Sequence, residues 1–110
     1  MANTMWFFPK WTTILPGSPM ISDPFEVTAF KTVAIKGYCA GFVGPGPLAL
    51  QLEGSDDLAV WDPIGTPLNI AAAGATVNDV VNNPPRFLRV TAITAGGSMT
   101  FFAMGVGREP

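Results

Sequence analysis

The stretch LALQLEGSDDLAVW, residues 48–61, decides the fold that we expect for this chain. Leu48, Leu50 and Leu52 occupy every second position at its start, which is the period of a β-strand with one buried face. Four turn-forming residues, GSDD at 54–57, follow, and Leu58 and Val60 then alternate again. The pattern predicts a β-hairpin whose second strand ends at Pro63, because proline cannot donate to a strand ladder.

Short segments of the same kind recur along the chain, separated by turns rich in Gly, Pro and Asn. Besides the hairpin, strands are expected near residues 30–42, 66–72, 76–81, 86–94 and 99–106. Gly37 and Gly41 predict a bulge or bend within the first of these. No helical period develops, and strands spaced by roughly 8–12 residues are typical of antiparallel sandwiches and barrels. We therefore predict an all-β protein, an antiparallel, jelly-roll-like β-sandwich of about eight short strands.

Residues 1–24 differ from the rest, because large apolar side chains crowd together there and proline recurs four times. Proline removes a backbone donor, so this segment is at best an edge strand. We predict two parts, an extended aromatic and proline-rich arm at 1–24 and a β-sandwich domain at 25–110. The predicted partner-binding residues of the arm are Met5, Trp6, Phe7, Phe8 and Trp11. The alternative is that the arm folds back as the first strand and its aromatic side chains cover the chain's own core.

The charge content of the chain is low. Only 13% of the residues are charged and 48% are hydrophobic, so apolar surface is expected to be covered by something else. The segment 101–104, Phe-Phe-Ala-Met, is apolar on both faces of a strand, which predicts an outer face covered by another subunit and hence a homo-oligomer. A net charge of −2 gives no basic footprint for nucleic acid and no attraction to an anionic membrane.

The N-terminal sequence lacks the pattern of a secretory signal, so synthesis and folding in a cytoplasm are expected. The single cysteine, Cys39, cannot close an internal disulfide and is expected in the core. Arg86 and Arg89 are expected to pair with Glu53 or with nearby aspartates.

The sequence contains few residues of the types that catalysis commonly uses. The chain has no histidine, which removes the Ser-His-Asp and Cys-His arrangements and the commonest metal ligand. The carboxylates of Asp56, Asp57 and Asp62 lie near Trp61, but a domain of this size has little room for a glycosidase cleft. The run 54–57 could offer oxygen ligands to calcium, although a tight turn accounts for the same residues. We predict a protein that is not an enzyme, with no catalytic residue, metal or cofactor.

Three elements follow in an order that resembles a known group of proteins. They are LQLEGSDD at 50–57 with Trp61 after it, then PPRFLRV at 84–90, and a final strand that opens after the Gly-Gly turn at 96–97. This order resembles small β-sandwich structural proteins of tailed-bacteriophage particles, over about residues 25–108.

The resemblance implies a component of the virion, made in the host cytoplasm. It would be a capsid cement or decoration protein, or a small head or tail accessory subunit, and its partners would be the major capsid protein or neighbouring accessory subunits.

Carbohydrate-binding modules also carry strand-turn-strand signatures with a tryptophan, so a second interpretation stays open. In that case Trp61, with Trp11 or Tyr38, would stack on sugar rings, and Asp56, Asp57 or Gln51 would bind sugar hydroxyls.

Overall fold

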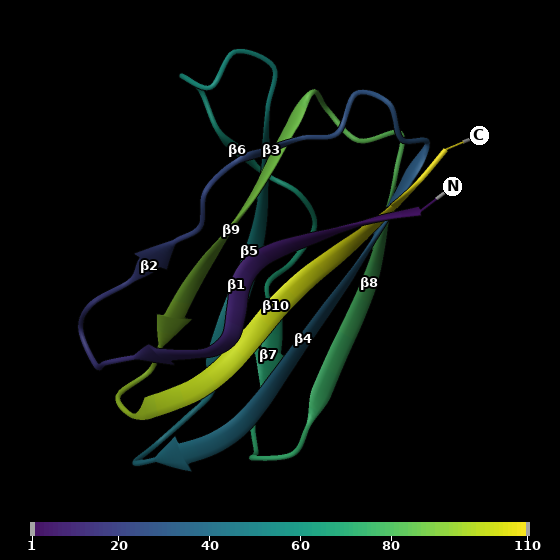
Figure 1. Cartoon of the computed structure of the whole chain (residues 1–110). Coiled ribbons are helices and arrows are strands. Elements are labelled where there is room, and N and C mark those ends of the chain that lie inside the picture. The colour runs from purple at the N-terminus through teal and green to yellow at the C-terminus, as the bar shows by residue number, and fades with distance from the viewer. Residues whose placement is uncertain (1, 110) are drawn as a thin grey trace.

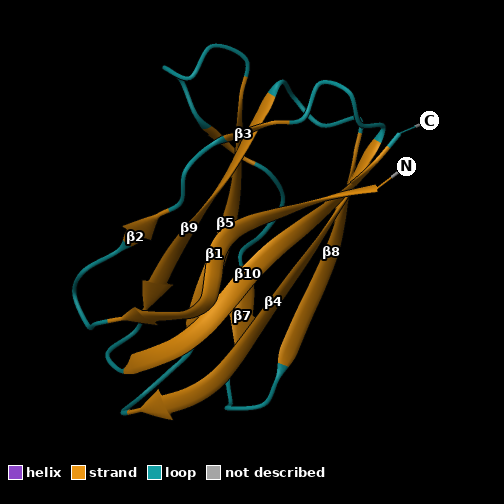
Figure 2. Cartoon of the chain, in the orientation of Figure 1, coloured by secondary structure: helices purple, strands orange, loops and turns teal. Residues whose placement is uncertain are grey.

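The computed structural model describes residues 2–109, which form ten strands in two antiparallel sheets packed face to face (Figures 1 and 2). The first sheet has the order β1 (Ala2–Ile14), β10 (Ser98–Arg108), β4 (Thr32–Val43) and β8 (Thr76–Asn82). The second sheet is centred on β9 (Phe87–Thr94) and β5 (Leu48–Ser55). Within it, β2 (Met20–Ile21) and β3 (Phe25–Glu26) pair with β9, and β6 (Asp62–Pro63) and β7 (Leu68–Ile70) pair with β5. Over residues 2–109, the chain forms no helix that is long and apolar enough to cross a membrane.

The strand order is that of a jelly roll. Since β2 and β3 pair with the same strand, they act as one interrupted strand, and so do β6 and β7; the ten segments thus fill eight strand positions. Numbered in this way, the first sheet runs 1-8-3-6 and the second runs 2-7-4-5, the alternation of an eight-stranded jelly roll. The predicted jelly-roll-like sandwich of about eight strands is therefore confirmed.

The core lies between the two sheets and is filled by the alternating residues that the sequence pointed to. The inward side chains of β5, β9 and β10 all have exposed fractions of 5% or less: Leu48, Leu50, Leu52, Leu88, Val90, Ala92, Met99, Phe101 and Ala103. Cys39 is also fully buried, and its thiol donates a hydrogen bond to the Gly41 carbonyl at 3.3 Å. Burial raises the pKa of this thiol, so it behaves as a small core residue, as expected.

The bulge predicted in the 30–42 strand is present in β4. Cys39 is in register with Phe101 and Gly41 with Thr100, which leaves Ala40 without a partner. Gly37 serves a different purpose, because a Cβ there would lie 2.5 Å from a methyl of Leu50 in the other sheet. Its missing side chain lets the two sheets approach closely at that point.

The central hairpin differs from its prediction in the return strand. β5 forms as expected and the return strand ends at Pro63 as predicted, but this strand is only two residues long, Asp62 and Pro63, and β7 continues the pairing with β5 further along the chain. The chain between β5 and β6 forms a projecting loop (Figure 1). Leu58 and Val60, which were expected to alternate on the return strand, belong to this loop and are 48% and 63% exposed. The reason is local: the side chains of Ser55 and Asp57 accept hydrogen bonds from the loop's backbone N–H groups, which therefore need no strand partner.

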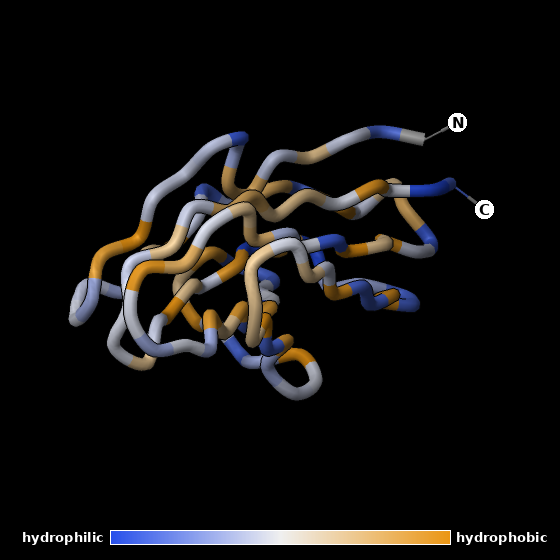
Figure 3. Tube along the Cα trace, turned by 90° about the horizontal axis from the view of Figure 1, so that it is seen from below, coloured by the Kyte–Doolittle hydropathy of each residue, from blue (hydrophilic) through white to orange (hydrophobic). Residues whose placement is uncertain are grey.

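The N-terminal segment follows the second of the two alternatives and folds back as a strand. β1 pairs antiparallel with β10 from Ala2–Arg108 to Ile14–Met99, so the first and last strands run side by side and the two chain ends lie together (Figure 3). Two register shifts, one around Phe7 and one between Phe8 and Thr12, absorb Pro9 without breaking the strand. The edge position that proline requires is the one β1 occupies.

Candidate functional site

The outer face of the first sheet carries a cluster of four aromatic rings, Trp6, Trp11, Tyr38 and Phe102, which we call the outer aromatic cluster. They come from three adjacent strands, β1, β10 and β4. The centroid of the Phe102 ring lies 5.7 Å from each of the other three, and Trp11 and Tyr38 are 5.9 Å apart. Tilted and edge-on pairs at such distances are favourable aromatic contacts.

Phe102 explains why its strand is apolar on both faces. Its neighbour Phe101 points into the core, whereas Phe102 points outward and is still only 6% exposed, because the tryptophans cover it. The covering rings themselves remain open to solvent: Trp6 is 40% exposed and Trp11 is 52% exposed. Phe102 is therefore buried, but the two tryptophan side chains that cover it still expose apolar surface to water.

The charges on this face have a single sign. The four strands of the first sheet contain Lys10, Lys36 and Arg108 and one acid, Asp79. Asp79 is in register with Ile35, whose side chain points to the core, so the acid does not share the outer face. The Lys10 ammonium lies 5.3 Å from the centroid of Phe102 and 5.9 Å from that of Trp11. The aromatic surface is therefore bordered by the Lys10 cation.

The five predicted partner-binding residues separate by the side of β1 on which they lie. Met5, Phe7 and Phe8 are 4–5% exposed, and the rings of Phe7 and Phe8 pack against Phe25 and Phe101 at 5.3 and 5.2 Å. These three side chains leave almost no surface for a partner, because the fold uses them in its core. Trp6 and Trp11 lie on the outer face, where partner binding stays a prediction.

Phe102 was not predicted as a site residue, and Tyr38 was named only as a sugar-stacking residue in the carbohydrate-binding interpretation. The sequence did signal Phe102, because it alternates with core residues of β10 and so belongs on the opposite face. Nothing in the local sequence places Tyr38 beside Trp11, since that proximity depends on the register of β4 with β10.

The outer face of the second sheet has a different character. Arg89 donates from Nε to Oε1 of Glu53 at 2.9 Å, and the Thr91 hydroxyl donates to the same oxygen at 2.8 Å. The ring of Trp61 covers the Arg89 guanidinium at 4.1 Å, and the predicted pairing of Arg89 with Glu53 is confirmed. Trp61 also donates from Nε1 to the Leu58 carbonyl at 3.3 Å. This face satisfies its polar groups internally.

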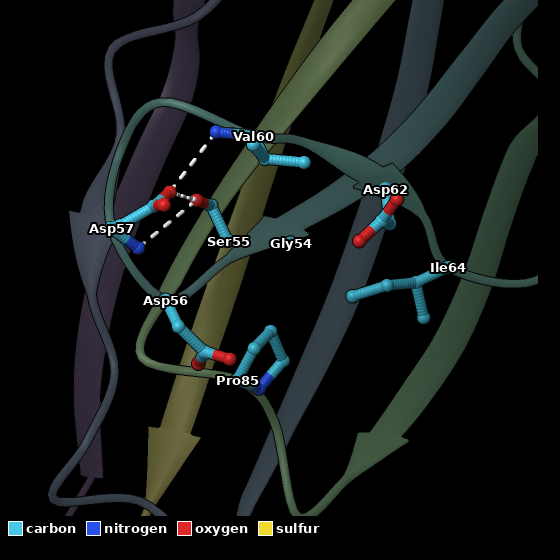
Figure 4. Close-up of a pocket in the computed structure, with 8 residues that line it drawn as sticks. All are labelled: Gly54, Ser55, Asp56, Asp57, Val60, Asp62, Ile64 and Pro85. Carbon is cyan, nitrogen blue, oxygen red and sulfur yellow. Dashed lines mark hydrogen bonds between the residues drawn. The ribbon is translucent and has the colours of Figure 1, made fainter.

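A shallow pocket of about 260 Å³ opens beside the β5–β6 loop (Figure 4). Its lining residues are Gly54, Ser55, Asp56, Asp57, Val60, Asp62, Ile64 and Pro85. The carboxylate of Asp57 is turned to its own loop, where the N–H groups of Val60 and Ala59 and the Ser55 hydroxyl hold its pKa below the ordinary value. Asp56 accepts a hydrogen bond from the Arg86 N–H at 3.2 Å.

These contacts favour the turn interpretation of 54–57 over a calcium site. Within residues 2–109, no three acidic, cysteine or histidine side chains are grouped closely enough to hold a metal ion. Trp61 is not among the residues that line the pocket, so its ring and these carboxylates do not form the shared platform that a sugar site would need.

The fold and its outer face define a jelly-roll β-sandwich with an exposed, cation-bordered aromatic cluster. No protein-family model matches the chain, and no curated protein matches its sequence. The structure is similar to that of the PBSX exported protein XepA, with a TM-score of 0.76 and 16% identity. The similarity covers 98% of this chain and 37% of XepA, so the chain spans well under half of that protein.

Two other solved structures are similar over most of their own length. One is described as belonging to Bacillus endospore appendages that form disulfide-linked pili; it has a TM-score of 0.55 and 17% identity, with 99% of this chain and 90% of that chain covered. The other is PirA, with a TM-score of 0.53 and 14% identity over 96% of this chain and 91% of that chain. At such identities these similarities establish the fold.

Proposed function

We propose that this chain is a non-enzymatic structural subunit of a phage-like particle, which binds neighbouring shell proteins through its outer aromatic cluster. Within such a particle, a capsid cement or decoration protein or a minor accessory subunit suits its size. The observation that carries the proposal is the exposure of Trp6 and Trp11, at 40% and 52%, side by side with other rings on a face free of acidic side chains.

The energetics of such a face favour a binding role. Burying a large aromatic side chain contributes roughly 1.5–3 kcal/mol, and tryptophan is enriched among the residues that dominate interfaces. About half of each indole is already covered within the chain, so a partner would gain the remaining part. In a symmetric shell, weak contacts of this kind add up through effective concentration.

The comparisons lend support in general terms. XepA is described as an exported protein of PBSX, and the appendage protein is described as part of pili. Both descriptions suit a protein that works in an assembly outside the cell or in a particle. The lack of histidine and the use of the Asp57 carboxylate within its own loop support a non-enzymatic role.

The test is a binding assay on particles. Particles prepared from a strain lacking this chain are incubated with purified protein and separated on a density gradient. The wild-type chain should sediment with the particles, whereas W6S/W11S should bind at least tenfold more weakly, because it removes the exposed indoles.

A matched control uses the other face of the sandwich. Ile21 and Ile93 are 59% and 46% exposed on strands of the second sheet, so I21S/I93S removes similar apolar surface elsewhere. We expect this control to bind like the wild type. Equal binding by W6S/W11S and the wild type would contradict the proposal.

A further inference from the structure

The β5–β6 loop presents a surface opposite in character to the outer aromatic cluster. In this loop Leu58 and Val60 are 48% and 63% exposed, so two aliphatic side chains lie close together in sequence at the surface. Val60 lines the pocket together with Asp56, Asp57 and Asp62 (Figure 4). We call residues 56–62 the acidic loop; it combines two exposed aliphatic side chains with three carboxylates.

The acidic loop is held in one shape before it meets a partner. Asp57 Oδ1 accepts hydrogen bonds from the N–H groups of Ala59 and Val60 at 2.9 and 3.0 Å, and Ser55 Oγ accepts from that of Leu58 at 3.0 Å. Trp61 closes the loop from the other side through its bond to the Leu58 carbonyl. A pre-ordered loop loses little conformational entropy on docking.

The charges of the whole chain are divided between these two surfaces. The chain has six cations and eight acids. Three of the cations, Lys10, Lys36 and Arg108, belong to the first sheet, whose single acid is directed away from the outer face. The remainder of the molecule holds the other three cations with the other seven acids, and two of those cations, Arg86 and Arg89, already have carboxylate partners. The molecule is therefore electrostatically two-ended.

We propose that copies of this chain associate head to tail, with the acidic loop of one copy docked on the outer aromatic cluster of the next. Leu58 and Val60 would pack on Trp6 and Trp11, and the loop's carboxylates would face Lys10, the cation beside the cluster. The proposal rests on the proposed function in taking the cluster as the binding surface, and it names the partner as a second copy. Charge complementarity selects this occupant, because the same chain carries both halves of the match.

The geometry makes the contact heterologous. The loop extends from strands of the second sheet, whereas the cluster lies on the outer face of the first sheet, so one copy cannot fill its own surface (Figure 1). In a bound pair, one copy keeps a free cluster and the other keeps a free loop. Association of this kind continues into a ring or an open filament instead of stopping at a symmetric dimer.

The test measures mass in solution by sedimentation velocity and light scattering over a range of protein and salt concentrations. The wild-type chain should gain mass with concentration and lose it as salt is added, since the contact pairs opposite charges. The cluster variant W6S/W11S and the loop variant L58S/V60S should each associate at least tenfold more weakly. I21S/I93S is the control that should behave like the wild type, and circular dichroism verifies that all the variants are folded.

Mixing the two defective variants gives the sharpest result. Each lacks one half of the contact and retains the other, so the mixture should form one-to-one pairs that grow no further. A wild-type chain that stays monomeric at millimolar concentration would overturn the proposal. So would a mixture that stays monomeric, or a loop variant that associates like the wild type, which would indicate a contact between two clusters.

The particle assay separates this inference from the proposed function. If W6S/W11S loses particle binding while the wild-type chain never self-associates, only the head-to-tail contact is wrong. If self-association follows the variants while W6S/W11S still binds particles like the wild type, the head-to-tail contact stands and the proposed function is wrong.

Discussion

The two outer faces of this sandwich are built on the same pleated strands but complete their contacts in different ways. On the second sheet, Arg89, Glu53, Thr91 and Trp61 form a network in which each side chain contacts another of the four. On the first sheet, the outward residues bury Phe102 but leave two indoles half in water. The difference shows that a low content of charged residues need not be spread evenly over a surface. In this molecule it is concentrated on the outer face of the first sheet.

The largest effect on stability should come from Phe101, the core-facing neighbour of Phe102 on β10. We expect Phe101→Ala to lower the free energy of unfolding by about 3–5 kcal/mol, because it leaves a cavity between the sheets. Phe102→Ala should cost only about 1.5–3 kcal/mol, since the exposed tryptophans can settle into the space. Urea unfolding of both variants gives the comparison, and an equal loss would mean that the outer face is packed as tightly as the core.

The ion-paired face should show an intermediate effect. Glu53→Ala removes the carboxylate that accepts hydrogen bonds from Arg89 and Thr91. Because the Glu53 and Arg89 side chains are only about one-fifth exposed, the variant should lower the free energy of unfolding by about 1–2 kcal/mol. Glu26→Ala breaks the exposed pair with Arg86 and should change stability by less than about 0.5 kcal/mol. If chemical denaturation shows the two variants to be equally stable, the contacts of Glu53 with Arg89 and Thr91 stabilise the fold no more than an exposed ion pair does.

The role of Trp61 offers a smaller test. In this structure its ring covers a guanidinium, so Trp61→Ala should cost about 0.5–1 kcal/mol. We expect neither the wild type nor this variant to bind a glycan array. Sugar binding that disappears with Trp61→Ala would support the carbohydrate-binding interpretation instead.

The smallest effect concerns the acidic loop. Hydrogen bonds lower the pKa of Asp57 in the folded chain, so its contribution to stability is present above the ordinary aspartate pKa and is lost as the pH falls below about 4. Between pH 5 and pH 2 the wild type should therefore lose slightly more stability than Asp57→Ala. Parallel acid titrations followed by circular dichroism would disprove this if the two proteins showed the same pH dependence.

Much of the fold could be predicted from alternation alone. A period of two and a flanking turn were enough to predict the inward leucines of β5. The same signals predicted the inward residues of β9, which are Leu88, Val90 and Ala92. The loop after Ser55 could not be predicted in this way, because two side chains replace strand hydrogen bonds there. Alternating Leu58 and Val60 look like a strand in the sequence and form a loop tip in the structure.

The candidate site was only partly predictable, for a physical reason. Composition drew attention to the aromatic residues of 5–11, but it could not assign each one to a face. Bulges at Phe7 and near Pro9 shift the alternation, and they decide that Phe8 enters the core while Trp11 remains outside. Such irregularities depend on the partner strand, which a local pattern does not contain.

The edges of the first sheet limit how copies of the protein can meet. β1 carries Pro9, which has no amide hydrogen, and two register shifts, while on β8 the Val80 N–H is held by the Asp79 carboxylate at 2.8 Å. Neither rim therefore offers the straight, unoccupied row of donors and acceptors on which amyloid-like stacking starts. Molecules crowded at high local density are thereby kept from fusing into a continuous sheet, and contact between them is directed to side chains, where it can be reversed.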